Sequence, residues 1–150
     1  LAVQAHAGHS FKFWKDARKD HELRQPALKF LKQVGLENRA EVVAGQLSHG
    51  EHRQLEIAMA LATRPKLLLL DEPMAGMGPK ESSAMVEILQ ELKGRLTILL
   101  IEHDMDVVFT LADKITVLVN GKVVATDSPE AIRKNPRVKA AYLGEENTYA

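Results

Sequence analysis

Two apolar runs in this sequence each end directly in charged residues. Asp71 and Glu72 follow Lys66–Leu70 with no residue between, and the segment Glu102–Asp104, which contains His103, follows Thr97–Ile101 in the same way. Four consecutive leucines belong in a protein interior. Because ligands of open α/β sheets bind beyond the carboxyl ends of the strands, these polar side chains are candidates for binding or catalysis.

A third polar group lies at a predicted helix start. Ser48 is followed three residues later by Glu51, the pattern of a capping box, and His49 and Gly50 lie between them. Free backbone N–H groups and the helix dipole attract an anion at such a start. Acids for a metal, a histidine and an anion-binding helix start together suggest a phosphate ester bound with magnesium.

Each of these groups also has a structural explanation. Acids often begin the loop or helix after a strand, a histidine such as His103 at a strand end is more often structural, and Ser-x-Gly-Glu before a helix is often only a cap. The combination of all three in this order favours a functional site.

The elements that must position these residues follow from hydrophobic period and turn signals. The predicted elements are a helix from Ser48 to Arg64, a strand Lys66–Leu70 covered on both faces, a helix Pro79–Lys93 ending at Gly94, a strand Thr97–Ile101, a short helix from Asp104 to Ala112, a hairpin of Ile115–Val119 and Lys122–Ala125 around Asn120-Gly121, and a last helix opened by Ser128-Pro129. Strands that alternate with helices predict an α/β domain with a mostly parallel sheet and an antiparallel hairpin at one side.

The first part of the chain is predicted to be helical. Apolar residues recur at helical spacing at Ala27, Leu28, Phe30, Leu31 and Val34. Gly35 is the signal that ends this helix. Residues 1–46 are therefore expected to form a helical subdomain, with 47–150 as the rest of the core. Phe11, Phe13 and Trp14 are expected to pack internally, with a partner surface as the alternative.

Bulk composition narrows the possible functions. A chain of 150 residues suits one domain. A net charge of zero disfavours nucleic acid and acidic lipid as partners, and the lack of cysteine excludes disulfides. No apolar run reaches the roughly 18 residues of a membrane span. The sequence begins with LAVQAHAG, in the middle of an apolar segment. We therefore expect this chain to be a part of a longer protein, the alternative being removal of a few leading residues.

Three motifs now carry a family resemblance. LSHGE resembles the LSGGQ signature of ABC-type ATPases, KLLLLDEP resembles their Walker B strand, and IEHD resembles their switch-histidine segment. The order and the intervals match, and VLVNGKVVATDSPEAI resembles the hairpin and helix that close these domains. The resemblance implies a partial P-loop NTPase domain of the ABC ATPase type, with a helical subdomain at the N-terminus and a β-hairpin plus helix at the C-terminus.

By this resemblance, the acids at the first strand end would serve ATP and Mg²⁺. Asp71 would hold Mg²⁺ through a water molecule. Glu72 would be the general base that polarises the attacking water, and His103 would hydrogen-bond the γ-phosphate. The signature would contact ATP bound on the opposite subunit of a dimer, through Ser48, His49, Gly50 and Glu51. The loop that would face the second subunit consists of Ala75, Gly76, Met77 and Gly78.

The chain also departs from the family pattern. None of the 150 residues forms a G-x-x-x-x-G-K-[ST] phosphate loop, which the family places, with a glutamine loop, upstream of the helical region. We therefore expect this chain alone neither to bind ATP tightly nor to turn it over, and its uncovered sheet to self-associate. His49 stands where the signature has glycine, Glu51 where it has glutamine, and Gly78 where the loop usually has aspartate.

LSxGE, DEPxAGM and NPRVKAAYLGEE resemble ATP-binding subunits of branched-chain amino acid importers and of their urea- and amide-importing relatives. The implied partners are a second ATPase subunit, identical or related, and transmembrane permease subunits, at the cytoplasmic side of the cell (inner) membrane. An ABC-type ATPase acting on DNA or ribosomes is disfavoured by the short helical region and neutral charge. A non-catalytic interaction module is disfavoured because Glu72 and His103 are both present.

Overall fold

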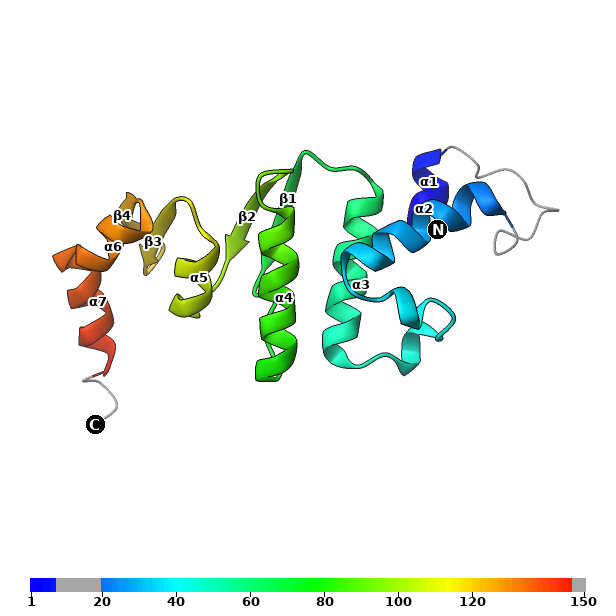
Figure 1. Ribbon diagram of the computed structural model, residues 1–150. Coiled ribbons are helices and arrows are strands. Elements are labelled where there is room, and N and C mark those ends of the chain that lie inside the picture. The colour runs from blue at the N-terminus through cyan, green and yellow to red at the C-terminus, as the bar shows by residue number, and fades with distance from the viewer. Residues whose placement is uncertain (8–19, 147–150) are drawn as a thin grey trace. The chain divides into compact units, whose positions relative to one another are not determined.

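The computed structural model describes residues 1–7 and 20–146, so Phe11, Phe13 and Trp14 lie outside the described residues. The chain divides into two compact units, 1–101 and 102–150; Figure 1 labels their helices and strands. The first unit contains α1 (Ala2–Ala7), α2 (His21–Gln33), two short 3₁₀ helices η2 (Glu37–Arg39) and η3 (Ala44–Gln46), α3 (His49–Ala62), β1 (Leu67–Asp71), α4 (Pro79–Leu92) and β2 (Thr97–Ile101). The second contains α5 (Met105–Leu111), β3 (Ile115–Val119), β4 (Lys122–Asp127), α6 (Pro129–Lys134) and α7 (Pro136–Glu146).

Helices α1, α2 and α3 pack on one another. Helix α2 ends where the sequence indicates, because Gly35 adopts φ +73 and its N–H bonds to the Lys32 carbonyl. The Leu36 N–H reaches the Leu31 carbonyl at 2.8 Å, which completes a Schellman motif and carries Leu36 into the core. The turn after α2 thereby anchors the segment that leads to α3.

Helix α3 begins at the predicted cap but ends at Ala62, two residues before the expected Arg64. Arg64 precedes Pro65, and the proline ring disfavours helical backbone in the residue before it. Arg64 instead adopts φ +52, and Thr63 closes the helix through its N–H to the Ala60 carbonyl.

Strands β1 and β2 form a parallel pair in the register Leu67↔Thr97 to Asp71↔Ile101. The face that includes Leu68 is buried, and α4 contributes the buried Met85 and Leu89 to the core of this unit. The prediction that the first strand is covered on both faces was wrong. On its other face, apolar side chains at least half exposed are Leu67, Leu69, Leu99 and Ile101.

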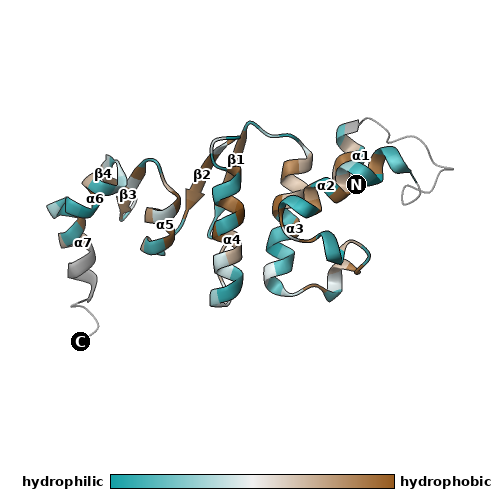
Figure 2. Cartoon of the chain, in the orientation of Figure 1, coloured by the Kyte–Doolittle hydropathy of each residue, from teal (hydrophilic) through white to brown (hydrophobic). Residues whose placement is uncertain are grey.

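The reason is that no second layer covers that face of the two-stranded parallel sheet in the described part of the chain. Figure 2 shows both strands as strongly apolar. An exposed apolar face of this kind favours association. Self-association of the 150-residue chain stays a prediction.

In the second unit, β3 and β4 form the predicted hairpin. Asn120 and Gly121 both adopt positive φ, 49° and 73°, as a two-residue type I′ turn requires. Strand β4 continues to Asp127, two residues beyond the predicted end. The core of this unit consists of Ile115, Val117, Ile132 and Val138.

The single last helix predicted from Ser128-Pro129 is instead two helices, α6 and α7. Asn135 precedes Pro136 and takes extended backbone, ψ 120°, which ends α6. The Asn135 side chain then accepts hydrogen bonds from the backbone N–H groups of Arg137 and Val138 and so caps α7.

Candidate functional site

The two adjacent acids lie at the carboxyl end of β1, as predicted. Asp71 is the last residue of the strand, and the Glu72 N–H continues the ladder to the Ile101 carbonyl at 2.9 Å. Glu72 has φ +44, a left-handed conformation that is uncommon outside glycine. The chain therefore turns sharply at Glu72, and both acidic residues are exposed at the strand end.

The loop after these acids is held by its own backbone. The Ala75 N–H bonds to the Glu72 carbonyl at 3.0 Å and the Met77 N–H to the Met74 carbonyl at 3.1 Å. Met74 is buried and anchors the loop, whereas Ala75 and Gly76 are exposed. The predicted interface loop is thus a compact turn with an accessible tip.

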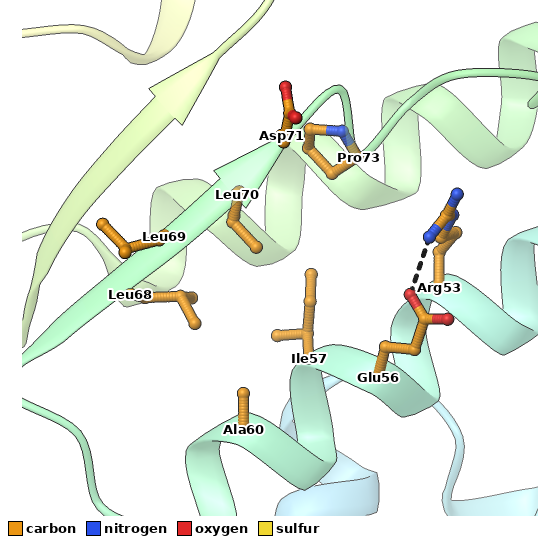
Figure 3. Close-up of a pocket in the computed structure, with 9 residues that line it drawn as sticks. All are labelled: Arg53, Glu56, Ile57, Ala60, Leu68, Leu69, Leu70, Asp71 and Pro73. Carbon is orange, nitrogen blue, oxygen red and sulfur yellow. Dashed lines mark hydrogen bonds and ion pairs between the residues drawn. The ribbon is translucent and has the colours of Figure 1, made fainter.

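A hollow of about 240 Å³ lies between α3 and β1 (Figure 3). Asp71 lines it at the carboxyl end of β1, and Arg53 and Glu56 form an ion pair, 2.9 Å between Nη1 and Oε2, at the α3 side. The rest of the lining is largely apolar, including Ile57 and Leu68. Because the arginine is already paired and the other two charged side chains are carboxylates, this hollow does not suit a triphosphate.

The predicted capping box of α3 is confirmed. The Glu51 N–H donates to Ser48 Oγ at 3.2 Å, and the Ser48 N–H donates to Glu51 Oε2 at 2.8 Å. Arg39, at the end of η2, pairs with the same carboxylate at 2.7 Å from Nε to Oε1. Glu51 was a candidate for nucleotide binding, but here its carboxylate serves the cap and Arg39.

These contacts also set the charge state of Glu51. The backbone N–H of Ser48, followed by the Arg39 guanidinium, holds the pKa of Glu51 below its ordinary value of 4.5. A carboxyl group with a lower pKa in the folded state stabilises the fold fully above the unfolded value. That contribution is lost as the pH falls through the lowered pKa.

We therefore expect Glu51→Gln to lower the midpoint of thermal unfolding at pH 7 by about 2 °C. The difference from the parent should shrink as the pH is lowered from 6 to 3, because the parent carboxylate becomes protonated. Circular dichroism melts across this pH range measure it, with Glu87→Gln on the exposed part of α4 as the control. A difference that stays constant across the range would contradict this role of Glu51.

The first turn of α3 contacts the loop that follows β1. Ser48 Oγ donates to Glu81 Oε1 at 3.1 Å, and His49 Nε2 lies 3.2 Å from the Ala75 carbonyl oxygen. A Cβ added to Gly50 would lie 2.7 Å from the Glu81 carboxyl carbon, so a larger residue here would displace the Glu81 side chain. The structure thus brings together the signature residues, the tip of the loop and the start of α4.

Sequence reasoning missed Arg39 and Glu81. Arg39 carried no motif. Glu81 did carry a signal, because Pro79 followed two residues later by glutamate is a typical helix start with an acid in the third position. Its carboxylate accepts from the Gly78 N–H at 3.3 Å, which serves a helix cap that Gly78 cannot supply with a side chain.

His103 and its neighbours belong to the second unit. The His103 side chain is 76% exposed, whereas the Glu102 side chain is only 2% exposed and accepts from the His103 N–H at 3.3 Å. Asp104 caps α5 by accepting from the N–H groups of Asp106 and Val107. The predicted cap is confirmed, and His103 presents an accessible imidazole at the end of β2.

Within the described residues, no group of three or more His, Asp or Glu side chains could hold a metal by itself. Mg²⁺ is commonly held by one or two carboxylates together with substrate phosphates and waters. The exposed Asp71 therefore fits a magnesium ion that arrives with a triphosphate. The described part of the chain also has no helix long and apolar enough to cross a membrane.

Comparison with known proteins identifies the family of the chain. The sequence model of the ABC transporter family matches residues 3–75, and that of the branched-chain amino acid ATP-binding cassette transporter matches residues 122–147. The chain belongs to the ABC transporter family of ATP-binding proteins, as the resemblance predicted. The match at its C-terminal end is to the branched-chain amino acid type within that family.

Curated relatives carry the same description. The high-affinity branched-chain amino acid transport ATP-binding protein BraF of Pseudomonas aeruginosa is 43% identical over 130 residues, which cover 85% of this chain and 51% of the relative. LivG of Escherichia coli (strain K12), described in the same words, is 44% identical over 130 residues with the same coverage. The chain spans about half the length of the curated relatives it matches.

Solved structures confirm the predicted fold. An ATP-binding cassette of an ABC transporter, MJ1267, is 32% identical with a TM-score of 0.73, covering 91% of this chain and 55% of that chain. The ADP conformation of MJ1267 is 29% identical with a TM-score of 0.75, covering 96% of this chain and 61% of that chain. The α/β class with a parallel strand pair and a C-terminal hairpin is thus established.

Proposed function

We propose that the full-length protein is the ATP-hydrolysing subunit of a membrane importer, with branched-chain amino acids as its cargo class. The observation that carries the proposal is local. The acids at the end of β1 begin a loop whose tip, at Ala75, contacts His49 through a hydrogen bond. His49 belongs to the signature turn, residues 48–51, at the start of α3. The names of BraF and LivG supply the cargo class.

The acids at the strand end would have separate roles. Mg²⁺ bound with ATP would neutralise charge on the β- and γ-phosphates. Asp71 would hold that ion through a water molecule, because magnesium retains much of its hydration shell. Glu72, on the sharp turn that projects it from the strand end, would accept a proton from the attacking water as general base.

His103 would donate a hydrogen bond to the γ-phosphate. Its imidazole is exposed and therefore accessible to a phosphate, and the Glu102 carboxylate holds the backbone beside it through the His103 N–H.

The signature turn would act on ATP held by the opposite subunit. Ser48 Oγ and the backbone N–H groups at the start of α3 would bind the γ-phosphate, and Gly50 would allow close backbone approach. The loop residues Ala75 to Gly78 would contact the partner subunit. His49 and Glu51 would support this turn through the loop carbonyl and the cap.

A head-to-tail pair of ATPase subunits, identical or related, would therefore be the catalytic unit. It would dock on transmembrane permease subunits at the cytoplasmic side of the cell membrane, so that closure of the pair drives transport. The neutral charge of the chain gives no support to a nucleic-acid substrate.

Disruption of the gene is expected to abolish energy-dependent uptake of leucine, isoleucine and valine, with restoration by the wild-type gene. Uptake of radiolabelled amino acids by whole cells measures this, and labelled urea is the contrasting solute. Loss of urea uptake with leucine uptake intact would reject the cargo class. Intact uptake of all these solutes would reject the assignment to this importer group.

A further inference from the structure

The carboxylate of Glu81, a residue of α4, lies against the first turn of α3. It accepts the Ser48 Oγ proton through Oε1 at 3.1 Å and the Gly78 N–H through Oε2 at 3.3 Å. It also covers the Gly50 backbone so closely that a Cβ there would overlap the carboxyl group. A negative group of this chain therefore already sits where the helix start attracts anions.

The hydrogen bond from Ser48 to Glu81 uses the only proton that the Ser48 hydroxyl can donate. A serine hydroxyl has one proton to donate and otherwise accepts. Ser48 Oγ accepts from the Glu51 N–H and gives its proton to Glu81. It cannot at the same time donate to a phosphate oxygen, and a carboxylate beside it repels a triphosphate.

We propose that Glu81 is a positioning residue that acts as an internal latch, occupying Ser48 until the triphosphate of the opposite subunit displaces it. This inference rests on the proposed function, because it assumes that Ser48 binds a triphosphate. The latch closes when Glu81 holds Ser48 and the start of α4 together. It opens when the incoming phosphate takes over the Ser48 proton and Glu81 retains only the Gly78 N–H.

A second contact joins the first turn of α3 to the loop that precedes α4. His49 Nε2 lies 3.2 Å from the Ala75 carbonyl oxygen, so the start of α3 contacts α4 through Glu81 and this loop through Ala75. Displacement of Glu81 leaves the His49 contact in place. The latch therefore governs access to Ser48 without detaching the loop.

The test uses the full-length protein in a Glu72→Gln background, where slow hydrolysis is expected to let an MgATP-bound dimer accumulate. Sedimentation velocity with MgATP gives the dimer dissociation constant. We expect Glu81→Ala to lower this constant about tenfold, because the competing charged acceptor is removed. Glu81→Gln, which keeps an acceptor without the charge, should give a smaller decrease, and Glu87→Ala on the exposed part of α4 should give none.

A merely structural role for Glu81 predicts the opposite sign, because loss of the Gly78 contact would loosen the loop and weaken the dimer. Thermal melts identify a variant that fails to fold, and the Gln variant preserves the test in that case. An unchanged or weaker dimer in the Glu81 variants, with the parent dimer intact, would overturn the latch and leave the proposed function standing. A parent that forms no dimer with MgATP would overturn both.

Discussion

Replacing Glu72 by glutamine in the full-length protein is expected to reduce ATP turnover by about 10²–10⁴-fold while leaving MgATP binding intact. Glutamine has the same shape but cannot accept a proton from water. Loss of the Glu72 charge should not weaken MgATP binding, since Asp71 is the residue assigned to hold the magnesium ion. Phosphate release measures turnover, and fluorescence of an ATP analogue measures binding.

The matched control is Glu87→Gln, the same chemical change on the exposed part of α4, which should leave both quantities unchanged. Thermal melts show whether the left-handed turn at residue 72 tolerates the substitution. A Glu72→Gln protein that hydrolyses ATP at the parent rate would remove Glu72 from the role of general base.

The second large effect concerns the 150 residues produced on their own. They contain no G-x-x-x-x-G-K-[ST] loop, so they lack the lysine and backbone N–H groups that cradle the phosphates in this family. Loss of one preorganised donor typically lowers a rate by about 10²–10³-fold, and loss of the whole cradle should lower it at least that much. We expect no tight binding of MgATP by calorimetry and no measurable phosphate release.

The full-length protein under the same conditions is the comparison, and far-ultraviolet circular dichroism establishes that the shorter chain is folded. Tight, Mg²⁺-dependent ATP binding by the 150 residues alone would show that the sites at the ends of β1 and β2 suffice for affinity. The assignment of ATP affinity to the phosphate loop, and not to these sites, would then be wrong.

Local signals in the sequence predicted much of the fold. The start of α3, the stop at Gly35 and the Asn120-Gly121 turn depend on hydrogen bonds and backbone angles within a few residues. The break between α6 and α7 is also local, and Asn135 before Pro136 was a readable signal for it. The family resemblance rested on motifs of the same kind, and the comparisons confirmed it.

Features that depend on distant residues were not predictable in the same way. Burial of β1 on both faces needs neighbouring layers, and a run of leucines does not reveal whether those layers are present. The contacts of Ser48 with Glu81 and of Arg39 with Glu51 join separate elements. Sequence reasoning therefore identified the acids and the signature turn but not the side chains that support them.

A crystal structure of the full-length Glu72→Gln protein with MgATP would show directly whether these residues share one site. We expect the Asp71 carboxylate to reach Mg²⁺ through one water molecule, His103 to lie beside the γ-phosphate, and Ser48 of one subunit to contact the nucleotide of the other. Nucleotide bound elsewhere, with Asp71 and His103 on opposite sides of the molecule, would contradict it.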